Sequence, residues 1–296
     1  MTLDQLRIFV AVAERQHMTQ AAKALNLAQS AVSHAVAALE ERHQTRLFER
    51  VGRRIVLTEA GGVLLTEARA VLAQAEAADL ALSDFGALRR GTLSVLASQT
   101  IAGYWLPRHL MAFHDSFPQI TVRLGIRNTA QVAQAVEEGS AELGFVEGTL
   151  PASGLIRTPV ARDQLVIVVG NRHPWAGAPA PTPAQLMAGA WILREPGSGT
   201  RSAFEQALPR FGLAAADLNI IMEFPSNEAV RAAVEAGRAA TALSASVAAA
   251  GIEAGLLHAV DFPLPDRQFF LLRHPTRYRT HAALALARMV LPDGKG

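Results

Sequence analysis

The sequence predicts a multi-domain protein of the α+β class, and three changes of pattern along the chain support this prediction. Residues 1–58 have the spacing of short helices followed by a small hairpin. Residues 59–88 have the composition of one long, alanine-rich helix. From residue 91 to residue 296, apolar runs typical of strands alternate with helical segments, which is the pattern of an α/β domain. With 296 residues, half of them apolar, the chain can bury two or three separate cores.

Composition excludes several kinds of site. The chain has no cysteine, which excludes disulfides, thiolate metal ligands and cysteine nucleophiles. No signal sequence opens the chain, and no apolar run approaches the ~20 residues of a membrane span, so we expect a cytoplasmic protein with no membrane partner. The formal net charge is only +2, so overall basicity is a weak indication of nucleic-acid binding.

The first 58 residues have the spacing of three helices around one core. Apolar residues at helical intervals predict a first helix from Leu3 to Glu14. Thr19 is the expected N-cap of a second helix over residues 20–25, and a turn at residues 26–27 leads to a third helix, Gln29 to His43. The outward face of the third helix is short and polar, with Gln29, Ser30, Ser33 and His34. Such a face suits base edges and phosphates in a major groove of double-stranded DNA.

A basic hairpin follows the third helix. Two short strands around Gly52 would form a wing with arginines near its tip, and arginine there can neutralise phosphates or enter a narrow minor groove. A three-helix unit with a solvated, charged hairpin is the alternative interpretation, but the long helix behind the wing favours a winged helix-turn-helix. The predicted DNA-binding residues are Thr19, Gln29, Ser30, Ser33, His34, Arg50, Arg53 and Arg54.

Five segments of this region resemble the LysR-type transcriptional regulators: Leu3–Phe9, Thr19–Leu25, Gln29–Ser33, Leu47–Arg50 and Leu57–Gly61. The resemblance covers the whole chain and is most specific in the first 61 residues. It implies a winged helix-turn-helix, a linker helix and a periplasmic-binding-protein-like effector domain, usually in a homotetramer. The effector half looks most like regulators of sulfur assimilation or of carbon-fixation genes. The expected partners are a two-fold-related promoter site, further copies of this chain and RNA polymerase.

The long helix over residues 59–88 carries a possible dimer seam. Apolar residues step by four and three along it, as the a and d positions of a coiled coil do: Leu64, Ala68, Val71, Ala75, Ala78 and Leu82. Alanines bury little area, so this seam alone would dimerise weakly. Packing of the helix against its own domain is the alternative. The family resemblance implies an antiparallel pair of linker helices.

The remainder, residues 91–296, is expected to form two Rossmann-like lobes with a cleft between them. Chain crossings near Arg162 and near residues 266–267 would assign residues 91–161 and 268–296 to one lobe and residues 162–267 to the other. Crossover helices between the strands predict two sheets rich in parallel pairs. The predicted strands are Thr92–Ala97, Thr121–Ile126, Leu143–Val146, Leu165–Gly170, Trp191–Arg194, Ile220–Phe224, Ala239–Leu243 and Phe269–Arg273.

Two segments have the composition of an anion site. Residues 98–100 follow the first strand, residues 195–201 follow a strand of the second lobe, and each opens a helix. Hydroxyls and backbone N–H groups there lie at the positive end of a helix dipole. Facing one another across the cleft, they would hold a carboxylate, sulfite, sulfate or phosphate, with no cofactor. Ordinary N-caps are the alternative for each segment. The predicted effector-binding residues are Ser98, Gln99, Thr100, Asn128, Thr129, Glu147, Glu195, Ser198, Gly199, Thr200 and Asn227.

Glu147 has two interpretations at this stage. In the cleft, its carboxylate would disfavour a fully ionised ligand and favour one that brings a proton. It is equally compatible with a solvent-facing loop.

Nucleotide binding and catalysis are less well supported. The run at residues 197–199 lacks the spacing of a dinucleotide fingerprint and the lysine of a phosphate-binding loop. No histidine pair has the spacing of a metal site, and Ser98 and Ser198 have no base partner that the sequence identifies. We therefore expect no enzymatic activity, no catalytic residue and no metal.

Overall fold

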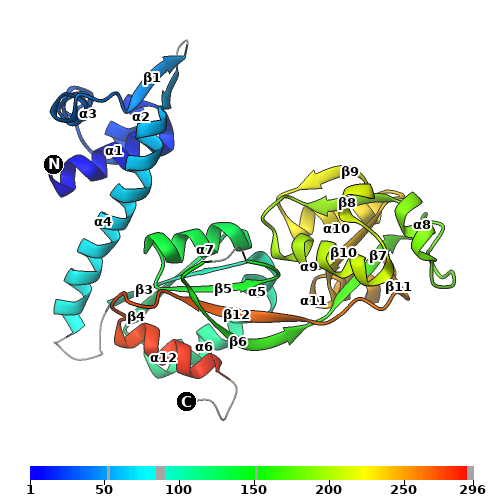
Figure 1. Ribbon diagram of the computed structural model, residues 1–296. Coiled ribbons are helices and arrows are strands. Elements are labelled where there is room, and N and C mark those ends of the chain that lie inside the picture. The colour runs from blue at the N-terminus through cyan, green and yellow to red at the C-terminus, as the bar shows by residue number, and fades with distance from the viewer. Residues whose placement is uncertain (52–53, 85–90, 151–152, 292–296) are drawn as a thin grey trace. The chain divides into compact units, whose positions relative to one another are not determined.

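The computed structural model describes residues 1–51, 54–84, 91–150 and 153–291 (Figure 1). The chain divides into two compact units at about residue 86. None of the helices in these ranges is long and apolar enough to cross a membrane.

The N-terminal unit is a three-helix core with a hairpin and one long helix. Leu6, Phe9 and Val12 of the first helix pack against Val32 and Leu39 of the third, and all are buried. The Phe48 ring at the base of the hairpin lies 5.4 Å from the ring of Phe9, so the hairpin is attached to the same core. The elements are α1 (Leu3–Arg15), α2 (Met18–Ala24), α3 (Gln29–His43), β1 (Phe48–Val51), β2 (Arg54–Leu57) and α4 (Glu59–Asp84).

The N-cap of α2 differs from the prediction. The N-cap is His17, whose Nδ1 accepts a hydrogen bond from the backbone N–H of Gln20 at 3.4 Å, and Thr19 lies inside the first turn. The prediction was wrong because an imidazole nitrogen can accept the N3 amide in place of a hydroxyl, and capping statistics favour the hydroxyl.

Helix α4 uses the first two positions of the predicted seam within its own unit. Leu64 packs against the core around α1, and Ala68 is buried in it. Val71, the third position, is 43% exposed. The first two of the six predicted seam positions therefore pack within the winged helix-turn-helix unit, and pairing with a second helix along the rest of the seam stays a prediction.

The C-terminal unit contains two five-stranded sheets, each the centre of a lobe. Lobe one has the strand order β4-β3-β5-β12-β6. Helices α5, α6 and α12 cover one face of this sheet and α7 covers the other. Its elements are β3 (Gly91–Ala97), α5 (Gln99–Tyr104), α6 (Leu106–Ser116), β4 (Ile120–Ile126), α7 (Thr129–Glu138), β5 (Leu143–Glu147), β6 (Ile156–Asp163), β12 (Arg267–Arg273) and α12 (His281–Val290).

Lobe two has the strand order β11-β7-β10-β8-β9. Helices α8 and α9 pack on one face, around Trp191 and Phe204, and α10 and α11 pack on the other (Figure 1). Its elements are β7 (Leu165–Gly170), α8 (Pro183–Ala188), β8 (Ala190–Arg194), α9 (Gly199–Ala207), the 3-10 turns η1 (Leu208–Phe211) and η2 (Ala215–Asp217), β9 (Asn219–Phe224), α10 (Asn227–Ala236), β10 (Ala240–Ser244), α11 (Ala245–Glu253) and β11 (Leu257–Val260).

Both sheets are mixed, whereas the sequence predicted sheets rich in parallel pairs. In lobe one β3 is parallel to β4 and β5, but β12 is antiparallel to β5 and β6. In lobe two β8 is parallel to β9 and β10, but β7 is antiparallel to β10 and β11. The antiparallel strands include those that carry the chain between the lobes, and these need no crossover helix. Strand β6 was missed because Pro159 and charged residues interrupt it, and β11 was missed because His258 interrupts its short apolar run.

Candidate effector and DNA-binding sites

The exposed face of α3 agrees with the predicted reading face. Gln29, Ser30 and His34 are exposed and Ser33 is half-buried. The side-chain Nε2 of Gln29 donates to Ser33 Oγ at 3.1 Å, so the two residues form one polar surface at the start of the helix. Thr19 on α2 is also exposed.

The wing is a two-stranded antiparallel hairpin fixed to α3. Arg50 on β1 is exposed and lies opposite Ile55 of β2. Glu40 of α3 holds the base of the hairpin, because its Oε1 accepts the backbone N–H groups of Leu47 at 2.8 Å and Phe48 at 3.1 Å. The backbone of Arg54 pairs with Val51. The predicted contact residue Arg53 lies outside the described residues.

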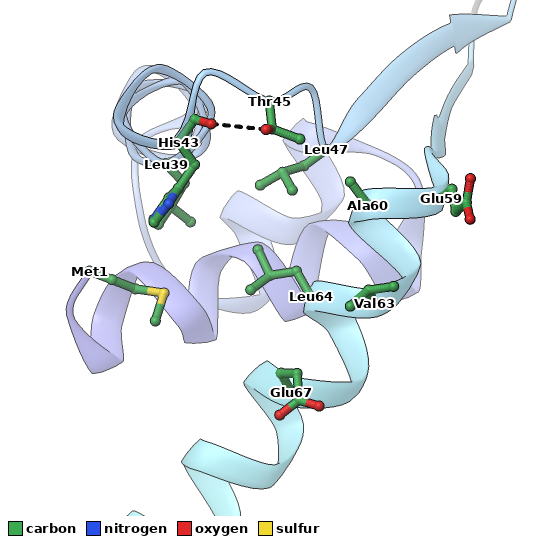
Figure 2. A pocket seen from close by; sticks show the side chains of 10 residues that line it. All are labelled: Met1, Leu39, His43, Thr45, Leu47, Glu59, Ala60, Val63, Leu64 and Glu67. Atoms are coloured by element: carbon green, nitrogen blue, oxygen red, sulfur yellow. Dashed lines mark hydrogen bonds between the residues drawn. The ribbon is translucent and has the colours of Figure 1, made fainter.

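An apolar groove of about 540 Å³ lies between Met1, the C-terminal end of α3 with the loop after it, and the first turns of α4 (Figure 2). Apolar side chains line most of it, while Glu59 and Glu67 lie on the α4 side. Val63 is 63% exposed at its edge. The other lining residues are Met1, Leu39, His43, Thr45, Leu47, Ala60 and Leu64.

In the C-terminal unit, Glu147 lies between the two lobes and is 2% exposed. Its carboxylate accepts hydrogen bonds from the hydroxyl of Ser98 in lobe one and from that of Thr200 in lobe two, the latter at 3.5 Å. Its backbone carbonyl accepts from Thr129 Oγ1 at 2.9 Å. The solvent-facing interpretation of Glu147 is therefore wrong. Ser98 occupies the N-cap position of α5, but its side chain makes no cap hydrogen bond and donates to Glu147 instead.

A second part of the network centres on Asn227, the first residue of α10, which is fully buried. Its Nδ2 donates to Thr100 Oγ1 at 3.1 Å, and its backbone N–H donates to Gln99 Oε1 at 2.8 Å. Thr100 Oγ1 also lies 3.5 Å from Thr200 Oγ1. The segments at residues 98–100 and 195–201 therefore face one another, as the sequence predicted.

The remaining predicted residues join the same network. Asn128 Nδ2 donates to Glu195 Oε1 at 3.2 Å across the lobes. Ser198 caps α9 through the backbone N–H of Arg201 at 3.5 Å, which is the ordinary capping role left open above. Gly199 lies against the carbonyl oxygen of Glu147. Ten of the eleven predicted effector-binding residues thus make contacts within this network, Ser198 caps its own helix, and contact of these residues with an effector stays a prediction.

Comparison with known proteins decides the family. Residues 86–294 match the model of the LysR substrate binding domain, and residues 3–62 match that of the bacterial regulatory helix-turn-helix protein, lysR family. The chain belongs to the LysR family of transcriptional regulators. It is 36% identical over 288 residues to the uncharacterized HTH-type transcriptional regulator YeiE of Escherichia coli K12, covering 95% of this chain and 94% of YeiE. It is 32% identical over 295 residues to a probable RuBisCO transcriptional regulator of Cyanophora paradoxa, covering 98% and 91% of the two chains.

Solved structures support the same fold. Full-length CbnR in complex with its target DNA has a TM-score of 0.68 and 25% identity, covering 98% of this chain and 99% of CbnR. The CcmR regulatory domain of Synechocystis PCC6803 in complex with 2-PG has a TM-score of 0.61 and 24% identity, covering 68% of this chain and 96% of that domain. The predicted winged helix-turn-helix and two-lobed α/β domain are confirmed, and this LysR-type regulator is not an enzyme.

Sequence reasoning missed the arginines and one carboxylate of the network. Arg194 ends β8 and is 4% exposed; it pairs with Glu195 and donates to Asn227 Oδ1 at 2.5 Å. Arg267 begins β12 and pairs with Asp163, the last residue of β6, at 2.7 Å. A charged residue at the end of an otherwise apolar strand was the available signal for Arg194, whereas Asp163 and Arg267 lie in strands with other polar residues and give no such signal.

Proposed function

We propose that this LysR-type regulator binds promoter DNA through its winged helix-turn-helix and that a small anionic metabolite held between the two lobes modulates that binding. The supporting observation is that hydroxyl donors from both lobes, those of Ser98 and Thr200, converge on one carboxylate, that of Glu147. Such a protein would act in the cytoplasm, where the promoter is.

The donor set favours an oxyanion ligand. Ser98 and Thr200 already bind a carboxylate, since Glu147 lies between them. Thr100 adds a third hydroxyl, 3.5 Å from that of Thr200, and the buried Arg267 supplies a positive charge 3.9 Å from Glu147. Buried hydroxyls and guanidinium groups are the ligands that proteins use for carboxylate, sulfate and phosphate groups. The CcmR regulatory domain, which has the same fold, was solved with 2-PG and offers a precedent for a small ligand.

Glu147 would set the protonation state of the ligand. A carboxylate at the anion position repels a fully ionised ligand, so a ligand that carries a proton, or that displaces Glu147, is favoured. The Glu147→Gln variant should then bind the ionised form more tightly and lose part of the pH dependence of binding. Identical binding curves for Glu147→Gln and the parent chain from pH 6 to pH 8 would contradict this role.

Thermal unfolding of the full chain with sulfate, sulfite, phosphate and small carboxylates tests the anion site. An anion at 100 times its Kd should add about 2.7 kcal/mol of stability. Thr200→Val should abolish the shift, whereas Ser116→Ala, an exposed position at the end of α6, should leave it unchanged. If none of these anions stabilises the parent chain, or if both variants respond alike, the cleft does not bind anions.

Assembly as a homodimer through α4, and then as a homotetramer, completes the proposal. The apolar groove beside α4 and the exposed Val63 at its edge support a second copy at this face (Figure 2). Two copies would present two reading helices to a two-fold-related site. A gel shift with the DNA upstream of the regulator's own gene tests the proposed DNA binding. The absence of a retarded complex at low salt would contradict that binding.

A further inference from the structure

The two chain crossings between the lobes are joined by a buried ion pair. Asp163 is the last residue of β6, where the chain leaves lobe one, and Arg267 is the first residue of β12, where it returns. The two residues are register partners, and Arg267 is 6% exposed. The Nε and Nη2 atoms of Arg267 each lie 2.7 Å from Asp163 Oδ2. The pair therefore holds the two crossing segments side by side at the hinge between the lobes.

Asp163 also reaches into lobe two. Its Oδ1 accepts a hydrogen bond from Ser244 Oγ at 2.7 Å, and Ser244 is the fully buried N-cap of α11. Next to it, the backbone N–H of Ala245 donates to the carbonyl of Gln164, the residue between β6 and β7, at 2.8 Å. A displacement of Asp163 would thus change its hydrogen bond to Ser244 at the start of α11.

The other edge of the Arg267 guanidinium reaches the effector network. Its Nη1 donates to Thr200 Oγ1 at 3.1 Å and lies 3.9 Å from Glu147 Oε1. One side chain therefore contacts the hinge carboxylate, a hydroxyl of lobe two and the carboxylate at the centre of the network. A guanidinium can do this because its donors are fixed in one plane and point in several directions, whereas a lysine ammonium offers a single point of charge.

We propose that Arg267 is the positioning residue that couples the charge in the interlobe cleft to the closure of the lobes. This coupling rests on the proposed function, because the charge that changes in the cleft is that of Glu147 or of the anion that replaces it. With the Glu147 carboxylate in place, Arg267 lies between two carboxylates, and this arrangement stabilises the closed lobes. When the charge at the Glu147 position changes, Arg267 loses a partner within 4 Å, and its pair with Asp163 carries the change to both crossing segments.

A purely structural role makes a different prediction. A buried ion pair that only supports the fold would destabilise the protein when broken, but it would not make the hinge respond to Glu147. A double-mutant cycle between Glu147 and Arg267 separates these roles, because only coupled residues depart from additivity. This cycle needs no effector, so its result does not depend on whether an anion binds in the cleft.

The cycle can be read as a distance between the lobes. Since the chain has no cysteine, the Ser116→Cys and Glu253→Cys substitutions at exposed ends of α6 and α11 give two unique spin-label sites. Labelled chains are mixed with excess unlabelled chain, and the open and closed populations are obtained from pulsed electron–electron distance measurements. The variants are Glu147→Gln, Arg267→Lys and the double variant. The control is Arg231→Gln, which breaks an ion pair within α10.

Glu147→Gln should raise the ratio of open to closed lobes by about fivefold, within the range of coupling between residues in contact. In the Arg267→Lys background the same substitution should change the ratio by less than about twofold. In the Arg231→Gln background the full effect should persist. Equal effects of Glu147→Gln in the Arg267→Lys and parent backgrounds, or no effect in the parent, would overturn the proposal.

If Arg267→Lys does not fold, as circular dichroism would show, the nearly isosteric Asp163→Asn replaces it in the double-mutant cycle with the same expected loss of coupling. A titration of the parent chain with sulfate forms a separate arm. If sulfate does not change the lobe distances but the double-mutant cycle shows coupling, the proposed anion site is contradicted and the coupling by Arg267 stands. If sulfate changes the distances but the cycle shows additive effects, only the coupling is contradicted.

Discussion

The carbonyl oxygen of Glu147 in lobe one lies 2.0 Å from the position that a Cβ atom on Gly199 in lobe two would occupy. Gly148, the next residue, has a φ of +78° and would bring its own Cβ within 2.3 Å of the Gly199 carbonyl. The lobes thus touch backbone to backbone at this point. Only glycine permits this approach, because the nearest atom to each added Cβ is a backbone carbonyl oxygen, which cannot turn away.

Gly199→Ala should therefore prevent the closed arrangement of the lobes. We expect a loss of about 1–3 kcal/mol in the free energy of unfolding, as for other overpacked sites, together with weaker anion binding. Denaturant unfolding of the full chain measures the first effect. Gly103→Ala is the matched control, since Gly103 lies in a helix with nothing within 4 Å of its added Cβ. A Gly199→Ala variant as stable as Gly103→Ala would contradict the close contact.

The N-terminal unit was largely predictable because its signals are local. The boundaries of α3, Gln29 and His43, agree with the prediction, since the helical spacing of apolar residues and the turn at residues 26–27 lie next to one another in sequence. The predicted seam shows the limit of such reasoning. A heptad spacing is the same whether Leu64 and Ala68 meet a partner helix or their own α1, and only the tertiary structure distinguishes the two.

The polar residues of the effector network that follow strands could be predicted from the sequence. Its ion pairs could not. Ser98, Thr100 and Thr200 follow strands, and parallel strand ends meet at one edge of a sheet. Arg267 pairs with Asp163, 104 positions away, and no local pattern indicates that distance. For the same reason the antiparallel pairing of the crossing strands β6 and β12 was not predicted, since it depends on how the chain passes between the lobes.

Glu40 should be required for a rigid wing. Glu40→Ala leaves the backbone N–H groups of Leu47 and Phe48 without their acceptor, which should cost about 1–3 kcal/mol of stability and weaken DNA binding. Glu41→Ala, at the neighbouring exposed position, is the control and should change stability by less than about 0.5 kcal/mol. Thermal unfolding and gel-shift affinity measure both effects. Equal results for the two variants would show that Glu40 does not fix the hairpin.

Arg50 should contact a DNA phosphate or enter the minor groove. Arg50→Ala should weaken binding similarly across sequences and reduce the slope of log K against log salt by about 1, if the contact is to a phosphate. The Arg7→Ala variant removes an exposed arginine of α1 that pairs with Asp4, and it should leave the slope unchanged. Fluorescence anisotropy at several salt concentrations gives the slopes, and an unaltered slope for Arg50→Ala would exclude a phosphate contact.

His173 should make lobe two sensitive to acid. Burial lowers the pKa of His173 below its usual value, and its Nδ1 accepts the backbone N–H of Trp175 at 3.1 Å, which requires the neutral ring. Because the folded-state pKa is the lower one, stability is fully present above the unfolded pKa of about 6.5 and decreases as the pH falls below it. His173→Asn keeps an acceptor without the titration. Its melting temperature should therefore fall less between pH 7 and pH 5 than that of the parent, and an identical fall would contradict this assignment.

Val63 should be buried by a second copy of the chain at the groove beside α4 (Figure 2). Val63→Lys would then place a charge in the dimer interface, in addition to removing an apolar side chain whose burial contributes about 1.5–3 kcal/mol. The dimer Kd should rise by at least about tenfold, since 1.4 kcal/mol corresponds to a factor of ten. Val51→Lys is a matched control, because Val51 is 60% exposed on β1 and does not line the groove. Sedimentation equilibrium measures both constants. If Val63→Lys and Val51→Lys assemble equally well, the second copy packs elsewhere on α4.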